Sequence, residues 1–432
     1  MQAMHPYLLS TAWRAALVGA ALAGCATAPG LAPSAPPAAS PPPAAEAATE
    51  PAAAAAAAHQ AAFARWVAGF RASAATAGIG EATLAAALDP VQYLPQVVQL
   101  DRAQPEFSRP VWTYLDNTVT PQRIAQGREK LAALQAELQA AERRHGVPPS
   151  VVVAIWGMES NFGGNYGSTP TLDALATLGF EGRRQAWARE QLLAALRIVQ
   201  NGDIDREHMV GSWAGAMGQT QFLPTSFLTH AVDADGDGRR DIWGSMADVV
   251  ASTAQYLARS GWQAGQPWGV EVQLPPGFDL ARADGLLRQP ASAWAAEGVQ
   301  GLQGAPLPAL DDAALLLPAG ARGPALLVGP NFRAILRYNN ATSYALAVGL
   351  LARQIDGGPP LQTAWPRELQ PLSRTELRQL QAALAERGFD AGTPDGVLGP
   401  ATREALRRWQ RSVGLPADGY PDAGLLQRLL QR

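Results

Sequence analysis

The sequence predicts a mainly helical protein with a small strand-bearing part and a separate helical module at its C-terminus. Three observations indicate this fold class. Apolar residues recur at helical spacing through most of the chain from about residue 61 onward. Short runs of β-forming residues, separated by Pro and Gly, are confined to about residues 270–338. A stretch rich in Gly and Pro, residues 357–371, then precedes a last amphipathic segment, residues 372–432.

The composition of the 432-residue chain excludes several classes of protein. Hydrophobic residues make up 47% of the chain, which is enough for a sizeable core. The 34 basic and 37 acidic residues leave a formal charge of −3, which argues against a broadly basic nucleic-acid-binding protein. The single cysteine, Cys25, excludes an intramolecular disulfide and a cysteine-based zinc site.

The N-terminus carries an apolar stretch, residues 15–24, that is too short to span a bilayer. Such a stretch is typical of a secretory signal peptide. Residues 22–25, Leu-Ala-Gly-Cys, resemble the cleavage site of bacterial lipoproteins, in which the cysteine becomes acylated. The resemblance implies that residues 1–24 are removed and that lipid on Cys25 anchors the protein. Ala26 after the cysteine implies the periplasmic face of the outer membrane. The alternative is an ordinary signal peptide with a coincidental cysteine.

Residues 25–60 consist largely of alanine and proline. This composition offers no large apolar side chains to bury, and proline favours an extended chain. The sequence therefore predicts a tether between the lipid anchor and the first folded domain.

Residues 61–356 contain one helix signal after another and form the predicted catalytic region. Thr120 followed by Pro121 is a typical helix start, and Gly146 is a typical helix end. The predicted helices cover about residues 61–70, 81–88, 121–145 and 149–159.

The module at residues 372–432 follows the predicted linker at residues 357–371. Ser373 and Glu376 have the spacing of a capping box, which predicts a helix start. A second amphipathic helix is predicted at residues 401–409. A segment of this size can fold alone, though with a small margin of stability.

Glu159 is the candidate catalytic residue because it lies in the last turn of an apolar helix that Gly163 and Gly164 bring to an end. The apolar neighbours Ile155 and Trp156 penalise the ionised carboxylate, and so does the partial negative charge of the helix C-terminus. A carboxyl group that stays protonated near neutral pH is suited to protonate a glycosidic oxygen. The alternative for this feature alone is a glutamate at a helix end that points into water.

Five motifs that occur in a consistent order carry a resemblance to a known family. They occupy residues 159–163, 181–184, 212–226, 252–257 and 337–345. Together they strongly resemble the membrane-bound lytic murein transglycosylase B family. The resemblance covers about residues 63–350 and implies a lysozyme-like helical core.

The resemblance also implies contacts with the substrate. Ser212 and Gln221, with Phe222 beside them, are implied to hold N-acetyl and hydroxyl groups of the sugar. Arg183 and Arg184 are implied to face a lactate or peptide carboxylate, since a guanidinium fork suits an anion. The remaining residues implied to line the groove or touch the substrate are Tyr114, Tyr256, Tyr338, Asn339 and Tyr344. The alternative for each aromatic residue is packing in the core.

No second carboxylate stands in a setting comparable to that of Glu159, whereas a conventional glycosidase needs a base or nucleophile as well as an acid. In the resembling family the 6-hydroxyl of muramic acid attacks its own anomeric carbon, and the glutamate donates a proton and then accepts one. The implied activity is non-hydrolytic cleavage of the MurNAc-GlcNAc β-1,4 bond of peptidoglycan to 1,6-anhydroMurNAc ends, with no cofactor required. The alternatives are a hydrolytic muramidase and an inactive peptidoglycan-anchoring lipoprotein.

An acidic loop follows the substrate motif at residues 212–226. Its residues with the 1,3,5,7,9 spacing of an EF-hand loop are Asp233, Asp235, Asp237, Arg239 and Asp241. Gly238 stands at the turn, whereas position twelve is Gly244 rather than glutamate, and Asp248 resembles the acid that replaces it in related proteins. We therefore expect a structural calcium ion. The alternative is a solvated turn without an ion.

The C-terminal module resembles a helical peptidoglycan-binding domain. The residues that carry this resemblance lie at 377–384, 388–389, 395–402 and 406–410. The implied role is to raise the local concentration of the enzyme on the polymer. The expected partners are therefore peptidoglycan glycan strands and, through acylated Cys25, the outer-membrane lipid; no nucleic acid is expected.

Overall fold

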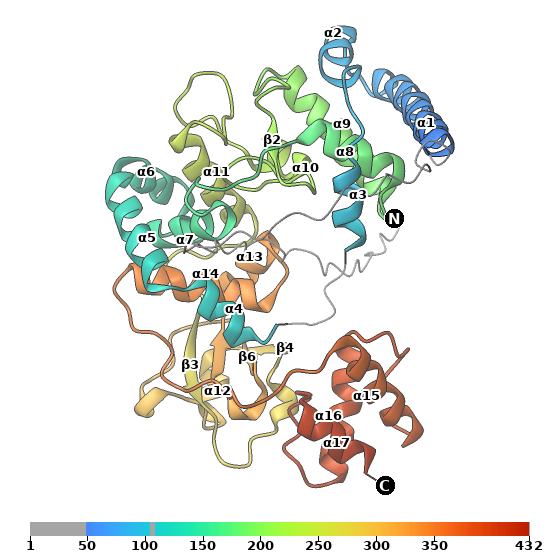
Figure 1. Cartoon of the computed structure of the whole chain (residues 1–432). Helices are drawn as coiled ribbons and strands as arrows, with labels where there is room; N and C mark the ends of the chain where they lie inside the picture. Colours follow the sequence, from blue (N-terminus) through green and yellow to red (C-terminus); the bar gives the residue numbers. More distant parts are fainter. Residues whose placement is uncertain (1–48, 104–108, 432) are drawn as a thin grey trace, which may run out of the picture. The chain divides into compact units, whose positions relative to one another are not determined.

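The computed structural model describes residues 49–103 and 109–431, and it confirms the predicted fold class (Figure 1). Helix α1 (Thr49–Thr76) belongs for the most part to a unit of its own. It begins within the residues predicted as a tether, because alanine has the highest intrinsic helix propensity and the run at residues 52–58 is all alanine. The first part of the predicted tether, the signal peptide and Cys25 lie outside the described residues.

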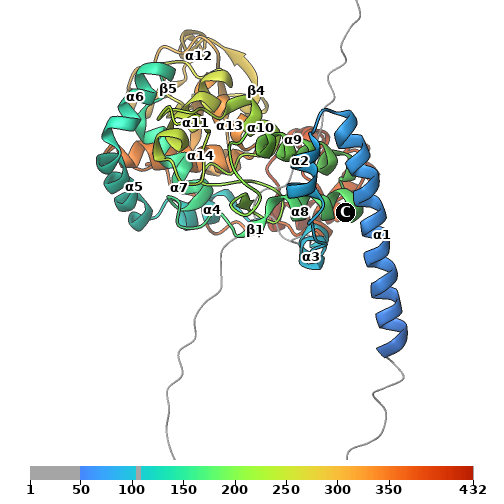
Figure 2. The ribbon, with the colours of Figure 1, turned by 90° about the horizontal axis from the view of Figure 1, so that it is seen from above.

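Helix α7 (Pro149–Ser160) forms the centre of the helical core. Its residues 150–157 are all buried, as expected for a helix that is apolar on every side. Figures 1 and 2 show α7 enclosed by neighbouring helices. The helices that contact it are α5 (Pro121–Ala133), α6 (Gln135–His145), α11 (Met246–Arg259) and α14 (Thr342–Ile355).

The helix predicted over residues 121–145 is in fact two helices, α5 and α6. Thr120 caps α5 and Gly146 ends α6 in a left-handed conformation, as predicted. Leu134 (φ −112°, ψ 29°) leaves the helical region between them. The break lets α5 pack on α7 and α14 while α6 packs mainly on α11, so tertiary packing decides where the helix is interrupted.

A second group of helices lies beside this core. Helices α8 (Thr171–Glu181) and α9 (Gln185–Gln200) pack against each other, and α10 (Pro224–His230) packs on α9. Strand β1 (Thr169–Pro170) pairs with β2 (Val210–Gly211). The shorter elements are α2 (Glu81–Thr83), the helical turn Leu84–Leu88, α3 (Pro95–Arg102), α4 (Val111–Thr118) and α13 (Pro330–Tyr338).

The predicted strand-bearing part is an antiparallel sheet with the order β4-β6-β7-β3-β5. The buried Trp294 shares a hydrophobic core with residues of this sheet and donates its indole N–H to the carbonyl of Ala313 at 3.0 Å. The elements are β3 (Gly269–Gln273), β4 (Asp284–Gln289), α12 (Ala291–Ala296), β5 (Gln300–Gly301), β6 (Ala313–Leu316) and β7 (Ala325–Val328).

The run at residues 334–338, which has β-like composition, is wrong as a strand prediction. It forms the second half of α13. Pro330 provides the first helical position, and Phe332, Ile335 and Tyr338 are spaced so that all three are buried on one side of the helix.

The C-terminal module folds around its own core. Its helices are α15 (Arg374–Glu386), α16 (Pro400–Ser412) and α17 (Ala423–Leu430). Ser373 and Glu376 form the predicted capping box, in which each side chain accepts from the backbone N–H of the other. Leu380, Leu406 and Trp409 are among the buried side chains between the helices.

Candidate functional site

Glu159 is the next-to-last residue of α7, as predicted, and its side chain is half-buried. The helix ends at Asn161 (φ 50°), before the glycines, because asparagine tolerates the left-handed conformation. Phe162 (φ 59°) continues in this region, which is strained for an aromatic residue. Its ring packs edge-on against Trp156 at 5.6 Å and so closely over Gly157 that a Cβ there would lie 2.7 Å from it. This packing holds the strained turn next to Glu159.

Two of the predicted tyrosines interact with Glu159, one through a hydrogen bond and one through its charge. The hydroxyl of Tyr344 donates a hydrogen bond to Oε1 of Glu159 at 2.6 Å. Burial, together with the charge of Glu159, raises the pKa of Tyr344 well above its usual value. Burial and the same charge raise the pKa of Tyr114 to about 12, although Arg123 opposes the shift. Both tyrosines therefore stay protonated at neutral pH, and Tyr344 acts as a fixed donor to the carboxyl group.

The structure also brings Phe222, Tyr256 and Tyr338 together. The ring of Phe222 lies 5.6 Å from that of Tyr256 and 5.8 Å from that of Tyr338, and the two tyrosines are 4.6 Å apart. The Tyr338 hydroxyl donates to the carbonyl of Thr220, and the Tyr256 hydroxyl donates to the carbonyl of Arg337. Phe222 and Tyr338 are buried and pack against Tyr256 from inside the protein. Tyr256 is half-buried and reaches the surface. Asn339 follows directly after α13.

The motif at residues 212–222 folds back on itself as a tight loop. Ser212 accepts a hydrogen bond at its side chain from the N–H of Ala216, whose carbonyl accepts from the N–H of Ser212. Gln221 (φ 52°) is in the left-handed region, and its amide donates to the carbonyls of Tyr166 and Gly218. The small residues of this motif are therefore needed for the turn itself as well as for the approach of a ligand.

Gln219 connects this loop to the helix that carries Glu159, a role that the sequence motif alone does not indicate. Its Oε1 accepts from the indole N–H of Trp156 at 2.9 Å, and its amide donates to the carbonyl of Trp243 at 2.7 Å. The available signal in the sequence was Trp156, because a buried indole N–H needs an acceptor.

Arg183 and Arg184 lie at the junction of α8 and α9 and both contact other parts of the chain. The backbone N–H of Arg183 donates to the carboxylate of Asp101, and its guanidinium forms an ion pair with the same group at 3.4 Å. The guanidinium of Arg184 lies 4.3 Å from the ring centroid of Trp187. Arg183 is thus held against α3 and Arg184 against α9, and both residues are exposed.

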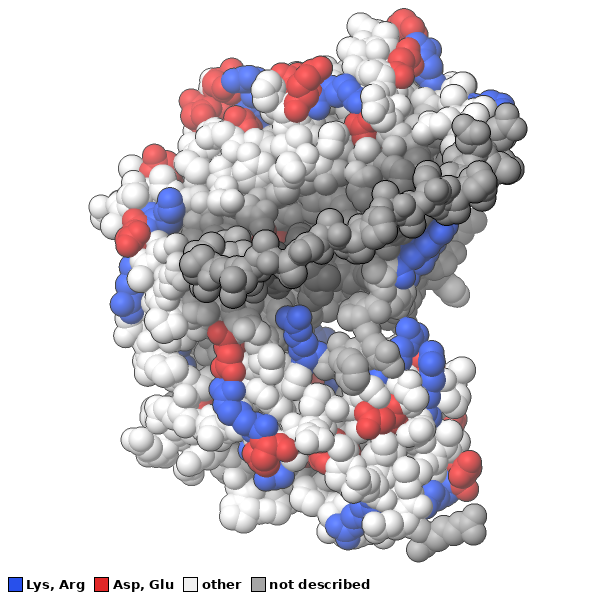
Figure 3. Space-filling view, viewed as in Figure 1, with Lys and Arg blue, Asp and Glu red and all other residues white. Residues whose placement is uncertain are grey.

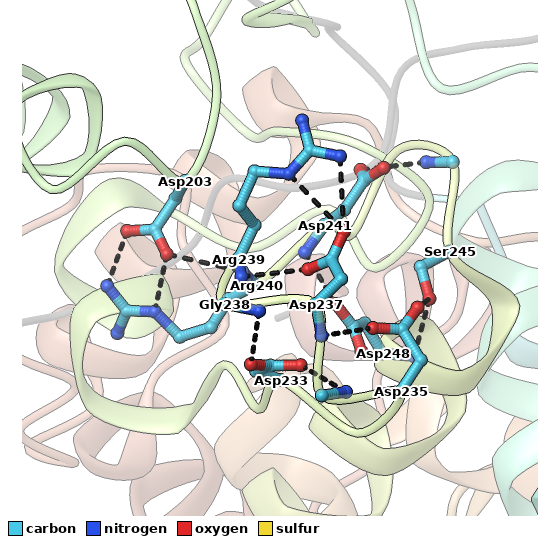
Figure 4. A network of polar contacts seen from close by, with 12 residues as sticks. Asp203, Asp233, Asp235, Asp237, Gly238, Arg239, Arg240, Asp241, Ser245 and Asp248 are labelled. Carbon is cyan, nitrogen blue, oxygen red and sulfur yellow. Dashed lines mark hydrogen bonds and ion pairs between the residues drawn. The ribbon is translucent and has the colours of Figure 1, made fainter.

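The acidic loop has the turn that the sequence predicts (Figure 4). Gly236 (φ 79°) and Gly238 (φ 89°) have left-handed conformations, and their N–H groups donate to the two oxygens of Asp233. Oxygens of Asp233, Asp235 and Asp248 lie within 4.8 Å of one another. The buried Asp248 accepts from two backbone N–H groups, yet burial and the charges of the other two aspartates raise its pKa. Such a group of oxygens suits a hard divalent cation.

The other residues of the predicted metal set have different partners. Asp237 pairs with the guanidinium of Arg239, and Asp241 accepts from the N–H groups of Trp243 and Gly244.

On the face shown in Figure 3, basic and acidic side chains are interspersed rather than separated by sign.

Within the described residues, no helix is both long enough and apolar enough to cross a membrane. The predicted signal peptide and lipidation site lie outside these residues.

Comparisons with known proteins identify both parts of the chain. Residues 62–353 match the transglycosylase SLT domain, and residues 373–429 match the peptidoglycan binding domain. Membrane-bound lytic murein transglycosylase B of Escherichia coli (strain K12) is 34% identical over 249 residues, which are 56% of this chain and 66% of that protein. The chain thus spans about two thirds of that relative.

Two solved structures extend the comparison. SltB3 from Pseudomonas aeruginosa, in complex with NAG-anhNAM-pentapeptide, is 53% identical, with a TM-score of 0.83 over 85% of this chain and 99% of that one. The lytic transglycosylase Slt35 of Escherichia coli, in complex with calcium, is 33% identical, with a TM-score of 0.55 over 62% of this chain and 85% of that one. The chain therefore belongs to the transglycosylase SLT domain family, the lytic murein transglycosylases, and carries a peptidoglycan-binding domain, as the sequence predicts.

Proposed function

We propose that this enzyme cleaves the MurNAc-GlcNAc β-1,4 bond of peptidoglycan without water and leaves 1,6-anhydroMurNAc ends. The observation that carries the proposal is Glu159 at the end of the buried helix α7, with Tyr344 donating to it at 2.6 Å. The complex of the SltB3 relative with an anhNAM ligand supports the same product.

The chemistry requires one carboxyl group in two successive roles. Glu159 first gives its proton to the glycosidic oxygen as the bond to the anomeric carbon breaks. The resulting carboxylate then takes the proton of the MurNAc 6-hydroxyl as that oxygen bonds to the same carbon. The hydrogen bond from Tyr344 holds Oε1 of Glu159 in place.

The test is the mass of the products from sacculi digested in water enriched in ¹⁸O. Transglycosylation yields anhydro ends that are lighter by one water than hydrolytic ends and carry no label. Labelled reducing ends would instead show that the enzyme is a hydrolytic muramidase.

The remaining substrate contacts are proposed for the residues to which the family resemblance assigns them. Tyr114 and Tyr256 would contact the sugar rings, and Ser212 with Gln221 would hold polar substituents. Arg183 and Arg184 would meet the carboxylates of the peptide or lactate. The expected lipid on Cys25 would keep the enzyme at the periplasmic face of the outer membrane, which agrees with the membrane-bound relative.

Calcium is proposed to bind among Asp233, Asp235 and Asp248. Three carboxylates so close together repel one another, and a divalent cation removes this repulsion. The calcium complex of the Slt35 relative supports the choice of ion. Bound calcium would stiffen the segment between Gln221 and Tyr256 and would take no part in the chemistry.

We expect calcium to raise the melting temperature by about 5 °C at concentrations some 100-fold above its Kd, because it binds only the folded loop. A chelator should reverse the gain. Asp235→Asn should abolish the response, whereas Asp205→Asn, an exposed carboxylate outside the loop, should retain it. Identical melting curves with calcium and with chelator would show that the loop is a solvated turn that binds no calcium.

A further inference from the structure

The predicted linker between the two domains is held against the catalytic region. We call residues 362–368 the strap. Its first two backbone N–H groups, of Gln362 and Thr363, donate to the buried carboxylate of Glu271 on β3 at 2.8 and 2.7 Å. At its other end Glu368 forms an ion pair with Arg322. The strap is thus fixed at both ends.

Two side chains in the middle of the strap contact helix α4. The ring of Trp365 lies 6.4 Å from that of the buried Trp112. The guanidinium of Arg367 donates two hydrogen bonds to the carboxylate of Asp116, at 2.6 and 2.9 Å. Trp112 and Asp116 are four residues apart and therefore lie on the same face of the helix. The strap holds this face of α4.

Tyr114 lies on the other side of α4. It is two residues away from both Trp112 and Asp116, so its side chain points away from them. Helix α4 packs on α14, which carries Tyr344, and the charge of Glu159 contributes to the raised pKa of Tyr114. Helix α4 has eight residues and no side-chain hydrogen bond at its N-cap, Pro110. A helix this short is marginal alone, so its neighbours decide where it sits.

We propose that Trp365 and Arg367 are positioning residues for glycan cleavage, which hold α4 so that Tyr114 keeps its position relative to Glu159. This inference rests on the proposed function of the site at Glu159. It means that the segment leading to the peptidoglycan-binding domain is part of the structural support of the active site.

The test uses full-length variants and a soluble murein glycan fragment, so that retention on sacculi does not enter the measurement. Arg367→Ala and Trp365→Ala should each lower kcat/KM by about tenfold, chiefly through KM, because Tyr114 would no longer hold the sugar in place. Arg288→Ala is the matched control: it breaks a similarly exposed ion pair, with Asp312, whose residues belong to neither the strap nor α4, and it should keep the wild-type rate. The double variant Asp116→Arg/Arg367→Asp should recover most of the loss.

The effect must pass through Tyr114 if the strap acts by positioning. In a Tyr114→Ala background, Arg367→Ala should therefore cause no further loss. Wild-type kcat/KM in both strap variants, or the same tenfold loss on top of Tyr114→Ala, would overturn the proposal. A cleavage-competent Glu159→Gln enzyme would instead refute the proposed function. Melting curves that match the wild type exclude unfolding as the cause, and Trp365→Phe provides a second, conservative check.

Discussion

Glu159→Gln should lower the release of anhydro-muropeptides from sacculi by about a thousandfold or more, while the protein stays folded. Glutamine has the shape of glutamate but can neither give the proton to the glycosidic oxygen nor take one from the 6-hydroxyl. General acid–base catalysis contributes about 10²–10⁴ in rate, and here one residue performs both steps. The measurement is product release quantified by mass spectrometry.

Glu190→Gln serves as the control for this variant, because Glu190 is an exposed glutamate on α9 and outside the proposed site. Both variants should melt like the wild type and sediment with sacculi to the same extent. If Glu159→Gln keeps more than a few percent of the rate, another residue is the acid.

Removal of the C-terminal module should weaken retention on sacculi by about a hundredfold and leave cleavage of small soluble glycans unchanged. The effect follows from the loss of a second binding contact with the same polymer, which otherwise raises the local enzyme concentration. The chain should be cut after Pro371, because this position keeps the strap and removes the module with its separate core. The measurement is the fraction of protein that sediments with sacculi.

The cut removes several polar contacts. They include the ion pairs Arg411–Asp279 and Arg407–Asp284 and the hydrogen bond from the N–H of Ala321 to Asp418. Equal sedimentation of the full and shortened proteins would contradict a binding role of the module. A shortened protein cut after Gly358 should in addition lose activity on soluble glycans, because it lacks the strap.

Local patterns in the sequence were sufficient for the features that depend on local residues. The position of Glu159 at a helix end, the capping box at Ser373 and the turn at Gly238 follow from residue types a few positions apart. The same patterns placed the strand-bearing part correctly but misjudged residues 334–338. There the burial of one helix face decided the structure.

Features that depend on distant contacts could not be predicted. The strap contact between Arg367 and Asp116 joins residues 251 positions apart, and nothing in the Gly/Pro-rich composition of the linker indicates it. Gln219 joins Trp156 across 63 positions, which hides its supporting role within a motif of small residues. The break at Leu134 likewise results from the different packing partners of α5 and α6.

The burial of α7 has a consequence for how the enzyme loses activity. Amide hydrogens exchange with solvent only when their hydrogen bonds open, and those in a helix enclosed on every side open with the whole domain. The backbone around Ala154 and Ile155 should therefore be among the slowest to exchange. Heat inactivation should accordingly coincide with global unfolding of the catalytic region. The reason is that Glu159, which transfers the proton, lies on α7, the most protected helix of this region.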